Sequence, residues 1–321
     1  MRRQLVALVS AATLIAASGT ACGGSSTEPS SSSGGVDKIT VGVVPIVDVA
    51  PIYLGKQKGF FAKRKIDPVL QPASGGGAIV AGVVSGNFKF AFANVVSLML
   101  ARDRGLPLKV VANGSSSTGK SGADYTAVAV RKDSPIKTPR DLAGRRISIN
   151  NLQNIGDTTV RASIRKAGGD PASPKFVEIN FTEAWAAVTK KQVDAAFLTE
   201  PFVTQALAQG GRVVAWNYVD SAPNLTVATY FTTEKVISSE NDLVSRFKAA
   251  INESLQYASS HPDEARAAVA TYTKIPPSTL AKIVLPLWPA QINQASIQTL
   301  GDDARGDGLL KKAPDVTGLL E

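Results

Sequence analysis

Short apolar runs alternate with amphipathic segments from residue 39 onward, and this order predicts an α/β fold. Runs rich in Val, Ile and Phe, which are typical of buried strands, occur at 39–44, 66–71, 88–93 and 108–112. Segments with helical spacing separate them, at 50–62, 77–86 and 94–105. Asn94 and Gly105 stand where a helix can begin and end. Strands that alternate with helices in this way predict βαβ units in a mostly parallel sheet.

A second series of the same kind follows, with strands expected at 125–130, 146–150, 175–179, 193–198 and 212–216. Residues 81–112 can be laid over 186–215, which places Phe92 on Phe197 and "KVVA" on "RVVA". The match predicts two lobes with one order of elements. The segment from residue 226 onward has no counterpart in the second series, so we expect it to return to the first lobe. The predicted lobes are 37–130 with 226–321, and 131–225, joined by a two-stranded hinge.

The first 22 residues have the pattern of an export signal. Arg2 and Arg3 precede an apolar run at 5–17 that is too short to span a membrane. Cys22, the single cysteine of the chain, follows this run, and 1–22 resembles a bacterial lipoprotein signal in which that cysteine becomes the lipidated N-terminus. Gly19 stands where such signals usually have Leu, so an ordinary secretory signal is the alternative. Residues 23–36 are rich in Gly and Ser and predict a flexible tether.

Charge and chemistry narrow the classes of function. The formal charge is +9, but the basic residues are dispersed and are not interleaved with aromatic residues, so no nucleic-acid surface is predicted. His261 is the single histidine, which leaves no set of histidines for a metal triad or a proton relay, and we expect no metal, cofactor or catalytic residue. The "TGKS" within 113–122 lacks the first glycine of a phosphate-binding loop. A mechanism based on lysine or on paired carboxylates stays open.

Polar or Gly-rich stretches follow the predicted strands. In a parallel sheet, ligands bind beyond the carboxyl ends of the strands. If two lobes face each other, these stretches line one cleft, although each alone could equally cap its own helix. They are 45–51, 72–77, 94–97, 151–159, 180–185 and 199–202.

Three segments, "GKQKGFFAKR", "SGG" and "VDAAFLTEPF", carry a resemblance to a known family. With the surrounding sequence they resemble the nitrate, sulfonate, taurine and thiamine-pyrimidine-precursor group of substrate-binding lipoproteins of ABC importers. The resemblance implies a two-lobed type II periplasmic-binding fold. It also implies a monomer on the outer face of the cytoplasmic membrane, which closes on a small oxyanion, sulfonate or pyrimidine-like ligand and delivers it to a permease. Some relatives in pyrimidine synthesis are enzymes that use a histidine and a cysteine cluster, so an enzyme on this fold is the alternative.

The resemblance also implies ligand-binding positions. These are Asp48, Ser74, Gly75, Gly76, Asn94, Asn154, Gly156, Asp157, Thr158 and Glu200. Because Asp48 and Glu200 are both acidic, the cleft is not a simple anion trap, and one of them can have a hinge or capping role instead.

Two positions near the predicted cleft have alternative interpretations. Asp157 is placed to cap the helix that follows its loop. Trp185 either stacks on a ligand ring or packs between helix and sheet.

Overall fold

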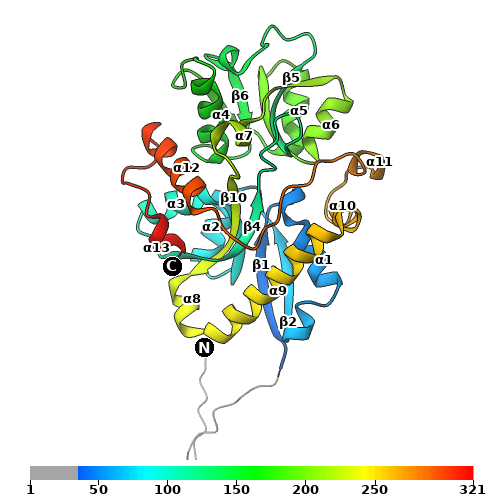
Figure 1. Cartoon of the computed structure of the whole chain (residues 1–321), viewed down its shortest axis with the longest axis vertical. Coiled ribbons are helices and arrows are strands. Elements are labelled where there is room, and N and C mark those ends of the chain that lie inside the picture. The colour runs from blue at the N-terminus through cyan, green and yellow to red at the C-terminus, as the bar shows by residue number, and fades with distance from the viewer. Residues whose placement is uncertain (1–34, 321) are drawn as a thin grey trace, which may run out of the picture. The chain divides into compact units, whose positions relative to one another are not determined.

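Two five-stranded sheets organise residues 35–320, the part of the chain that the computed structural model describes (Figure 1). The strand order is β2-β1-β3-β10-β4 in the first sheet and β7-β6-β8-β5-β9 in the second. The two orders correspond strand for strand. The prediction of two α/β lobes with one arrangement of elements is therefore confirmed.

Four strands of each sheet share a direction and the fifth opposes them. In the first sheet β1 is parallel to β2 and β3, whereas β10 is antiparallel to β3 and β4. In the second sheet β6 is parallel to β7 and β8, and β5 is antiparallel to β8 and β9. The first sheet contains β1 (Asp37–Val43), β2 (Ile66–Pro72), β3 (Phe90–Asn94), β4 (Leu108–Ser116) and β10 (Thr226–Thr233). The second contains β5 (Thr126–Arg131), β6 (Arg146–Ile149), β7 (Lys175–Glu178), β8 (Ala195–Thr199) and β9 (Gly211–Ala215).

The chain enters the second lobe earlier than predicted. β5 pairs with β8, with Val128 opposite Phe197, so it belongs to the second sheet. The predicted boundary near residue 130 is wrong because it falls inside this strand, and the crossing lies between Ser116 and Thr126. The return crossing precedes Thr226, where β10 begins between β3 and β4.

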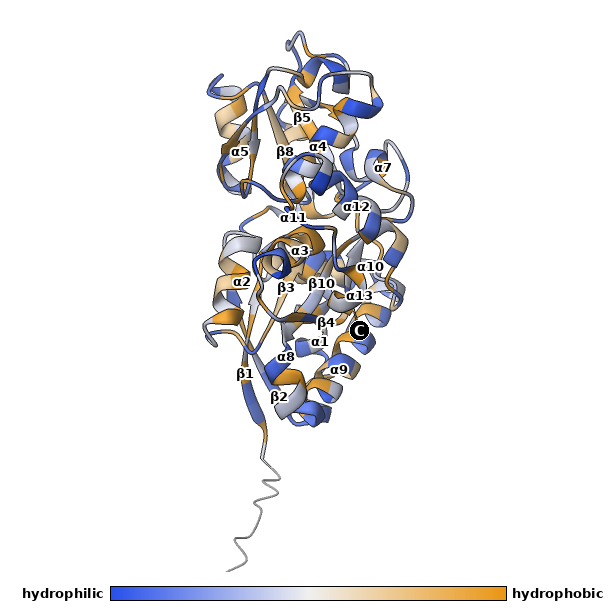
Figure 2. Cartoon of the chain, turned by 90° about the vertical axis from the view of Figure 1, so that its left-hand side faces the viewer, coloured by the Kyte–Doolittle hydropathy of each residue, from blue (hydrophilic) through white to orange (hydrophobic). Residues whose placement is uncertain are grey.

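Helices flank both sheets. Those of the first half are η1 (Val47–Val49), α1 (Ala50–Gln57), η2 (Ala62–Arg64), α2 (Gly76–Val84) and α3 (Val95–Asp103). Those of the second lobe are η3 (Pro139–Leu142), α4 (Ile155–Lys166), α5 (Phe181–Thr189), α6 (Phe202–Ala208) and α7 (Asn217–Ser221). The C-terminal part contains α8 (Glu234–Ser239), α9 (Asn241–Ser260), α10 (Pro262–Ala270), α11 (Pro277–Leu280), α12 (Gln294–Gly306) and α13 (Val316–Leu320). Figure 2 shows α3 as largely apolar, and its first seven residues are all buried near the level where the lobes meet.

The start of α4 differs from the prediction. Asn154 is its N-cap, because the Asn154 Oδ1 accepts a hydrogen bond from the Ile155 N–H at 2.8 Å. Asp157 lies in the first turn, and its Oδ2 accepts from the Gln153 N–H at 3.1 Å. The predicted cap at Asp157 is wrong because the helix begins before it, and Asp157 reaches back to hold the turn.

A third segment, residues 281–293, crosses between the lobes and is called the strap here. It connects α11 to α12, which lie on opposite sides of the view in Figure 1. Leu287 of the strap exchanges two backbone hydrogen bonds with Ser116 at the end of β4, at 2.8 and 3.0 Å. Within residues 35–320 no helix has both the length and the apolar character needed to cross a bilayer.

Candidate ligand-binding cleft

Three cavities that share lining residues run between the two sheets. The inner cavity encloses about 40 Å³, the outer cavity about 290 Å³ and the rear cavity about 150 Å³. Val44, Ile46 and Phe181 line both the inner and the outer cavity. Gly76 lines both the inner and the rear cavity. The three spaces therefore form one cleft.

All six stretches that were predicted to line a cleft contribute to these cavities. Parallel strands end at the same edge of each sheet, and the two edges face each other, which brings the stretches together. Their contributions are Ile46 and Asp48, then Ser74 and Gly76, then Asn94 and Ser97, then Asn151 to Ile155, then Asn180 to Thr182, and finally Thr199 and Phe202.

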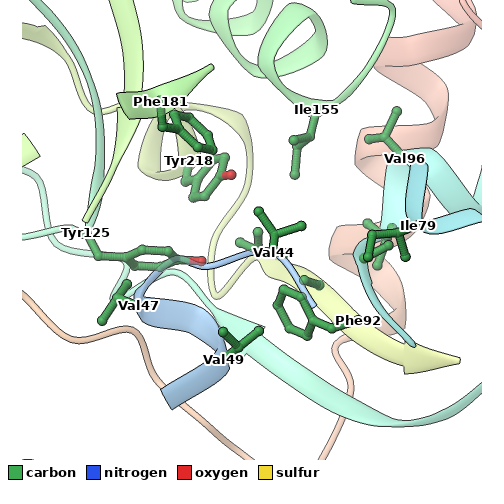
Figure 3. Packing of buried hydrophobic residues seen from close by; sticks show 14 of the residues in the cluster. Val44, Val47, Val49, Ile79, Phe92, Val96, Tyr125, Ile155, Phe181 and Tyr218 are labelled. Carbon is green, nitrogen blue, oxygen red and sulfur yellow. The ribbon is translucent and has the colours of Figure 1, made fainter. Parts of the chain in front are cut away.

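Aromatic rings from both lobes surround the inner cavity (Figure 3). Phe181 and Tyr218 of the second lobe face Val44 and Phe92 of the first. The rings of Phe197 and Tyr218 lie 6.1 Å apart, and both line the cavity. Rings prefer to contact other rings edge-to-face or in offset stacks, so the inner cavity together with the larger outer cavity that it joins suits a flat, largely apolar ligand.

The charge of the cleft is unlike that of an anion site. Among the described residues that line the inner and outer cavities, Asp48 is the single charged side chain, and neither Lys nor Arg is present. Arg104 lines the rear cavity, which lies beyond Gly76. An anion in the inner cavity would therefore meet a carboxylate and no cationic side chain.

Asp48 is held in η1 with 2% of its surface exposed. Its Oδ1 accepts a hydrogen bond from the Ser115 Oγ at 2.6 Å, and its carbonyl oxygen accepts one from the Trp288 Nε1–H of the strap at 3.2 Å. Its Oδ2 is buried and has no partner among the described residues. Burial raises the pKa of Asp48 to about 6, against the lowering effects of hydrogen bonds from Ser115 and Tyr125. The sequence-predicted residue thus lines the inner cavity, although its Oδ2 is itself buried.

Tyrosines surround this carboxyl group. Burial raises the pKa of Tyr125, Tyr218 and Tyr230 well above the ordinary value, and the charge of Asp48 adds to the rise in all three. The hydroxyls of Tyr125 and Tyr230 are buried without a partner among the described residues. In Figure 3 the Tyr125 hydroxyl lies beside the segment that carries Val47, and Tyr125 lowers the pKa of the neighbouring Asp48 carboxyl as a hydrogen-bond donor. Because buried polar groups are normally hydrogen-bonded, the Asp48 carboxyl is an acceptor within reach of this hydroxyl.

The rear of the cleft is closed by hydrogen bonds between the lobes, which we call the latch. The Asn154 Nδ2 donates to the Ser97 Oγ at 2.9 Å and to the Asn151 Oδ1 at 3.1 Å. The Asn151 Oδ1 also accepts from the Gly77 N–H at 2.9 Å. Asn94 caps α3 as predicted, since its Oδ1 accepts from the Ser97 N–H at 3.0 Å. The latch therefore connects the first turns of α2 and α3 to the loop before α4.

Glycines allow close packing at the latch. A Cβ atom on Gly76 would lie 1.9 Å from the Ser97 Oγ of its own lobe and 3.3 Å from the Asn154 Nδ2 of the other, and one on Gly75 would lie 3.1 Å from the Asn150 Nδ2 of the other lobe. Gly76 lines the inner cavity and Ser74 the outer one, whereas Gly75 lines none of the three.

Three predicted site residues in the first turn of α4 line none of the three cavities. Gly156 packs against Ile149 and Phe197, so that a Cβ there would come within 3.0 Å of the Ile149 side chain. The Thr158 hydroxyl donates to the Asn154 carbonyl oxygen at 3.2 Å. Asp157 is buried beneath the turn that it holds, and burial raises its pKa to about 6. These residues support the loop rather than face the cleft.

Glu200 also lies outside the three cavities. Its Oε2 accepts from the Thr204 N–H at 3.0 Å and its Oε1 from the Thr204 Oγ1 at 2.7 Å. The Oε1 also accepts a hydrogen bond from the Val284 N–H of the strap at 3.3 Å. Burial raises the pKa of Glu200 to about 7. The position fits the capping or hinge role, because this carboxyl joins the start of α6 to the strap.

Trp185 packs between helix and sheet, the second of the two alternatives. A Cβ atom on Gly211, at the start of β9, would lie 2.7 Å from its ring, and it lines none of the three cavities. The ring that does line the cleft is Phe181, one helical turn earlier and directly after a predicted strand. Its position after a predicted strand could therefore have identified Phe181 as a cleft residue from the sequence. Tyr218 follows β9 with no comparable signal in its local sequence.

A model of the family described as NMT1/THI5 like matches residues 46–265. The chain belongs to this family. A curated relative, the riboflavin-binding protein RibY of Chloroflexus aurantiacus, is 25% identical over 232 residues, which cover 71% of this chain and 63% of the relative. The matched region thus spans less than two thirds of that relative's length.

Solved structures share the fold of this NMT1/THI5-like protein. The alkanesulfonate-binding protein SsuA from Xanthomonas axonopodis pv. citri, bound to MOPS, has a TM-score of 0.76 at 17% identity, over 89% of this chain and 99% of SsuA. The zinc-bound ligand-binding component of an ABC-type import system from Staphylococcus aureus has a TM-score of 0.77 at 14% identity, over 89% and 96% of the two chains. The predictions of the family and of a two-lobed periplasmic-binding fold are confirmed.

Proposed function

We propose that this NMT1/THI5-like protein is the extracytoplasmic solute-binding component of an ABC importer, which closes its two lobes on a small flat organic molecule. The observation that carries the proposal is the inner cavity, where both lobes contribute rings and a buried carboxylate has an unsatisfied oxygen. A site assembled from both lobes is the arrangement in which a ligand can drive closure.

The cleft favours a heteroaromatic ligand over an oxyanion. The absence of Lys and Arg among the described residues that line the inner and outer cavities argues against sulfonate or nitrate. Phe92 and Phe181, on opposite sides of the space, support stacking of a ring. The similarity to a riboflavin-binding protein points the same way, toward flavin- or pyrimidine-like molecules.

Closure would act through the segments that join the lobes. A ligand that touches Phe92 of the first lobe and Phe181 of the second makes both contacts only in the closed state. Its binding free energy is therefore more favourable in the closed state, and it shifts the equilibrium between open and closed lobes toward that state. The crossings before β5 and before β10 are the hinge, and the strap spans it. The closed monomer then presents both lobes to a permease.

The proposed location depends on Cys22, which lies outside the described residues. If a lipid on this residue holds the protein on the outer face of the cytoplasmic membrane, Cys22→Ser should move the protein to the soluble fraction. Retention of the variant in washed membranes would contradict the anchor and leave the cleft proposal intact.

A thermal-shift screen of the purified protein tests the function. Riboflavin, thiamine pyrimidines, taurine, alkanesulfonates, bicarbonate and nitrate are compared at several concentrations, because a binder raises the melting temperature with the ratio of its concentration to Kd. We expect a heterocycle to stabilise the protein. Stabilisation by sulfonates or nitrate alone would contradict the assignment of ligand class. Chromatography of the incubated ligands detects turnover, which would support the enzyme alternative.

A further inference from the structure

We infer that the outer edge of the second sheet binds a linear anionic polymer, a polyol-phosphate chain, through a row of exposed cations. Basic residues are dispersed along the sequence, but the sheet gathers six of them at this edge, which we call the crown. Its members are all exposed and are Lys132, Arg145, Arg146, Lys175, Lys190 and Lys191. The crown lies at the amino ends of β6 and β7, whereas the cleft lies beyond their carboxyl ends. This interaction is therefore separate from ligand binding in the cleft.

Backbone contacts make the crown one continuous surface. Arg146 and Lys175 are register partners at the starts of β6 and β7. The Arg146 Nη2 donates to the Lys191 carbonyl oxygen at 3.1 Å, in the turn before β8. Arg131 donates from Nη1 to a carbonyl oxygen in the last turn of α5 at 3.0 Å, which connects the end of β5, next to Lys132, to the same turn. Neighbouring strands lie about 4.8 Å apart, so the row across β7, β6, β8 and β5 is about 15 Å long.

Few acidic groups compensate the charge of the crown. Asp194 accepts a hydrogen bond from the Arg146 N–H at 2.9 Å and lies 4.0 Å from its guanidinium, and Asp133 pairs with Arg131. The other five crown side chains form no ion pair among residues 35–320. Like charges gathered on one edge repel each other, and a bound polyanion relieves that repulsion.

Helix dipoles do not account for the row. Lys190 and Lys191 directly follow the end of α5, where cations are stabilised by the dipole of the helix. Lys132, Arg146 and Lys175 stand instead at the ends of strands. Because sheets have only small net dipoles, these three cations are not explained by local electrostatics.

The place of the crown in the protein favours a polymer outside the membrane. β1 begins at the end of the first lobe that lies away from the second, so the chain enters its folded part at the end opposite to the crown (Figure 1). If a lipid anchor precedes β1, the crown faces away from the membrane. The choice of partner thus rests on the proposed location, whereas the charged row itself does not.

The crown also lacks a platform on which a nucleic-acid base could stack. Phe176, the aromatic residue beside Lys175, has the guanidinium carbon of Arg161 at 5.0 Å from its ring centroid. Proteins that bind single-stranded nucleic acids combine a basic groove with stacking rings. A polyol-phosphate chain needs no stacking and presents one negative charge per repeat to a row of cations.

The test compares two variants that lose the same charge at different places. The crown variant carries Lys132→Gln, Lys175→Gln, Lys190→Gln and Lys191→Gln. The control variant carries the same change at four exposed lysines of the first lobe that form no ion pair among the described residues, Lys38→Gln, Lys65→Gln, Lys235→Gln and Lys248→Gln. Each set includes one lysine at positive φ, Lys191 in the crown and Lys65 in the control. Unfolding transitions check that both variants fold.

Binding is measured on the full chain with Cys22→Ser in every arm, so that no attached lipid contributes. The probe is a labelled poly(glycerol phosphate) chain, followed by fluorescence anisotropy at about 50 and about 500 mM NaCl. A single-stranded RNA and vesicles of phosphatidylglycerol and phosphatidylcholine are compared with it at equal phosphate concentration.

We expect wild type to bind the polymer and to lose roughly 100-fold in affinity between the two salt concentrations, because bound phosphates release their counterions. The crown variant should lose roughly 10- to 100-fold at low salt, while the control variant stays within about threefold of wild type. The inference is overturned if wild type does not bind the polymer, if both variants lose affinity equally, or if RNA or vesicles bind at least as tightly as the polymer. Polymer binding by a protein that fails the thermal-shift screen would contradict the proposed function alone.

Discussion

Phe92 and Phe197 occupy the same place in equivalent strands of the two sheets, and both line the inner cavity. Each is the third residue of its strand, β3 in the first sheet and β8 in the second. Both precede the strand end that faces the opposite lobe. The correspondence extends the match between the two halves of the sequence to the site itself, since the same strand supplies an aromatic ring from each side.

Removing an aromatic side chain from the cleft should weaken binding. Phe181→Ala deletes a ring that lies against Phe202 with centroids 5.9 Å apart and that lines both the inner and the outer cavity. We expect affinity for a heteroaromatic ligand to fall about 10- to 100-fold, from lost ring contact and apolar burial. Calorimetry measures the change. Trp185→Phe, in the same helix but turned away from the cleft, should bind as wild type, and an equal loss in both variants would contradict the placement.

The latch should favour the closed state even without ligand. Asn154→Ala removes the bond to Ser97 together with the α4 cap, so we expect a larger radius of gyration by small-angle X-ray scattering and weaker binding by about tenfold. Thr233→Ala removes the cap of α8, where Oγ1 accepts from the Val236 N–H, and breaks no bond between the lobes. This control should lose about 1 kcal/mol of stability and keep its radius of gyration. If scattering by Asn154→Ala matches that of wild type, the latch does not hold the lobes together.

Asp48 should reduce stability at neutral pH. Burial raises its folded-state pKa from 3.8 to about 6, so the unfolded chain ionises at lower pH than the folded one. The folded state therefore loses stability from this group as pH rises from about 4 to about 6, and the loss is complete above that window. Asp48→Asn should thus raise the free energy of unfolding by about 3 kcal/mol at pH 8 and by little at pH 4. Denaturant unfolding at both pH values measures the difference, and a gain of equal size at each pH would exclude ionisation as its cause.

Ligand affinity should depend on the same ionisation. A ligand N–H pairs best with the carboxylate, so affinity should fall as pH is lowered through about 6, because Asp48 then carries a proton that must be released when the ligand binds. Asp48→Asn should abolish this dependence. Asp157→Asn should preserve it, although burial raises the pKa of Asp157 to about 6 as well, because that carboxyl holds the α4 turn outside the cavities. The other titratable groups that interact with Asp48 are Tyr125, Tyr218, Tyr230, Tyr272 and Asp124. Dependence that persists in Asp48→Asn would assign the proton to another of these groups or to the ligand.

Local sequence patterns predicted most strands and helices, two lobes with one order of elements, and the loops that line the cleft. Strand and helix periods depend on neighbours a few residues apart, so 39–44 and 88–93 could be recognised as strands without a fold. The loops at 45–51 and 94–97 could then be placed at one sheet edge, because parallel strands end together. Within the loop 45–51, the family resemblance then singled out Asp48.

Tertiary structure alone decided which side chains of those loops face the ligand space. β5 belongs to the second sheet because its hydrogen-bond partners, β8 and β9, come more than 60 residues later in the chain. Glu200 turns toward α6 and the strap, and Trp185 turns toward β9, because tertiary hydrogen bonds and packing set these directions rather than the position of each residue in the sequence. Tyr125 meets Asp48 because the first crossing, between Ser116 and Thr126, brings the start of β5 beside η1. Contacts of this kind join residues that are remote in sequence, and no local pattern encodes them.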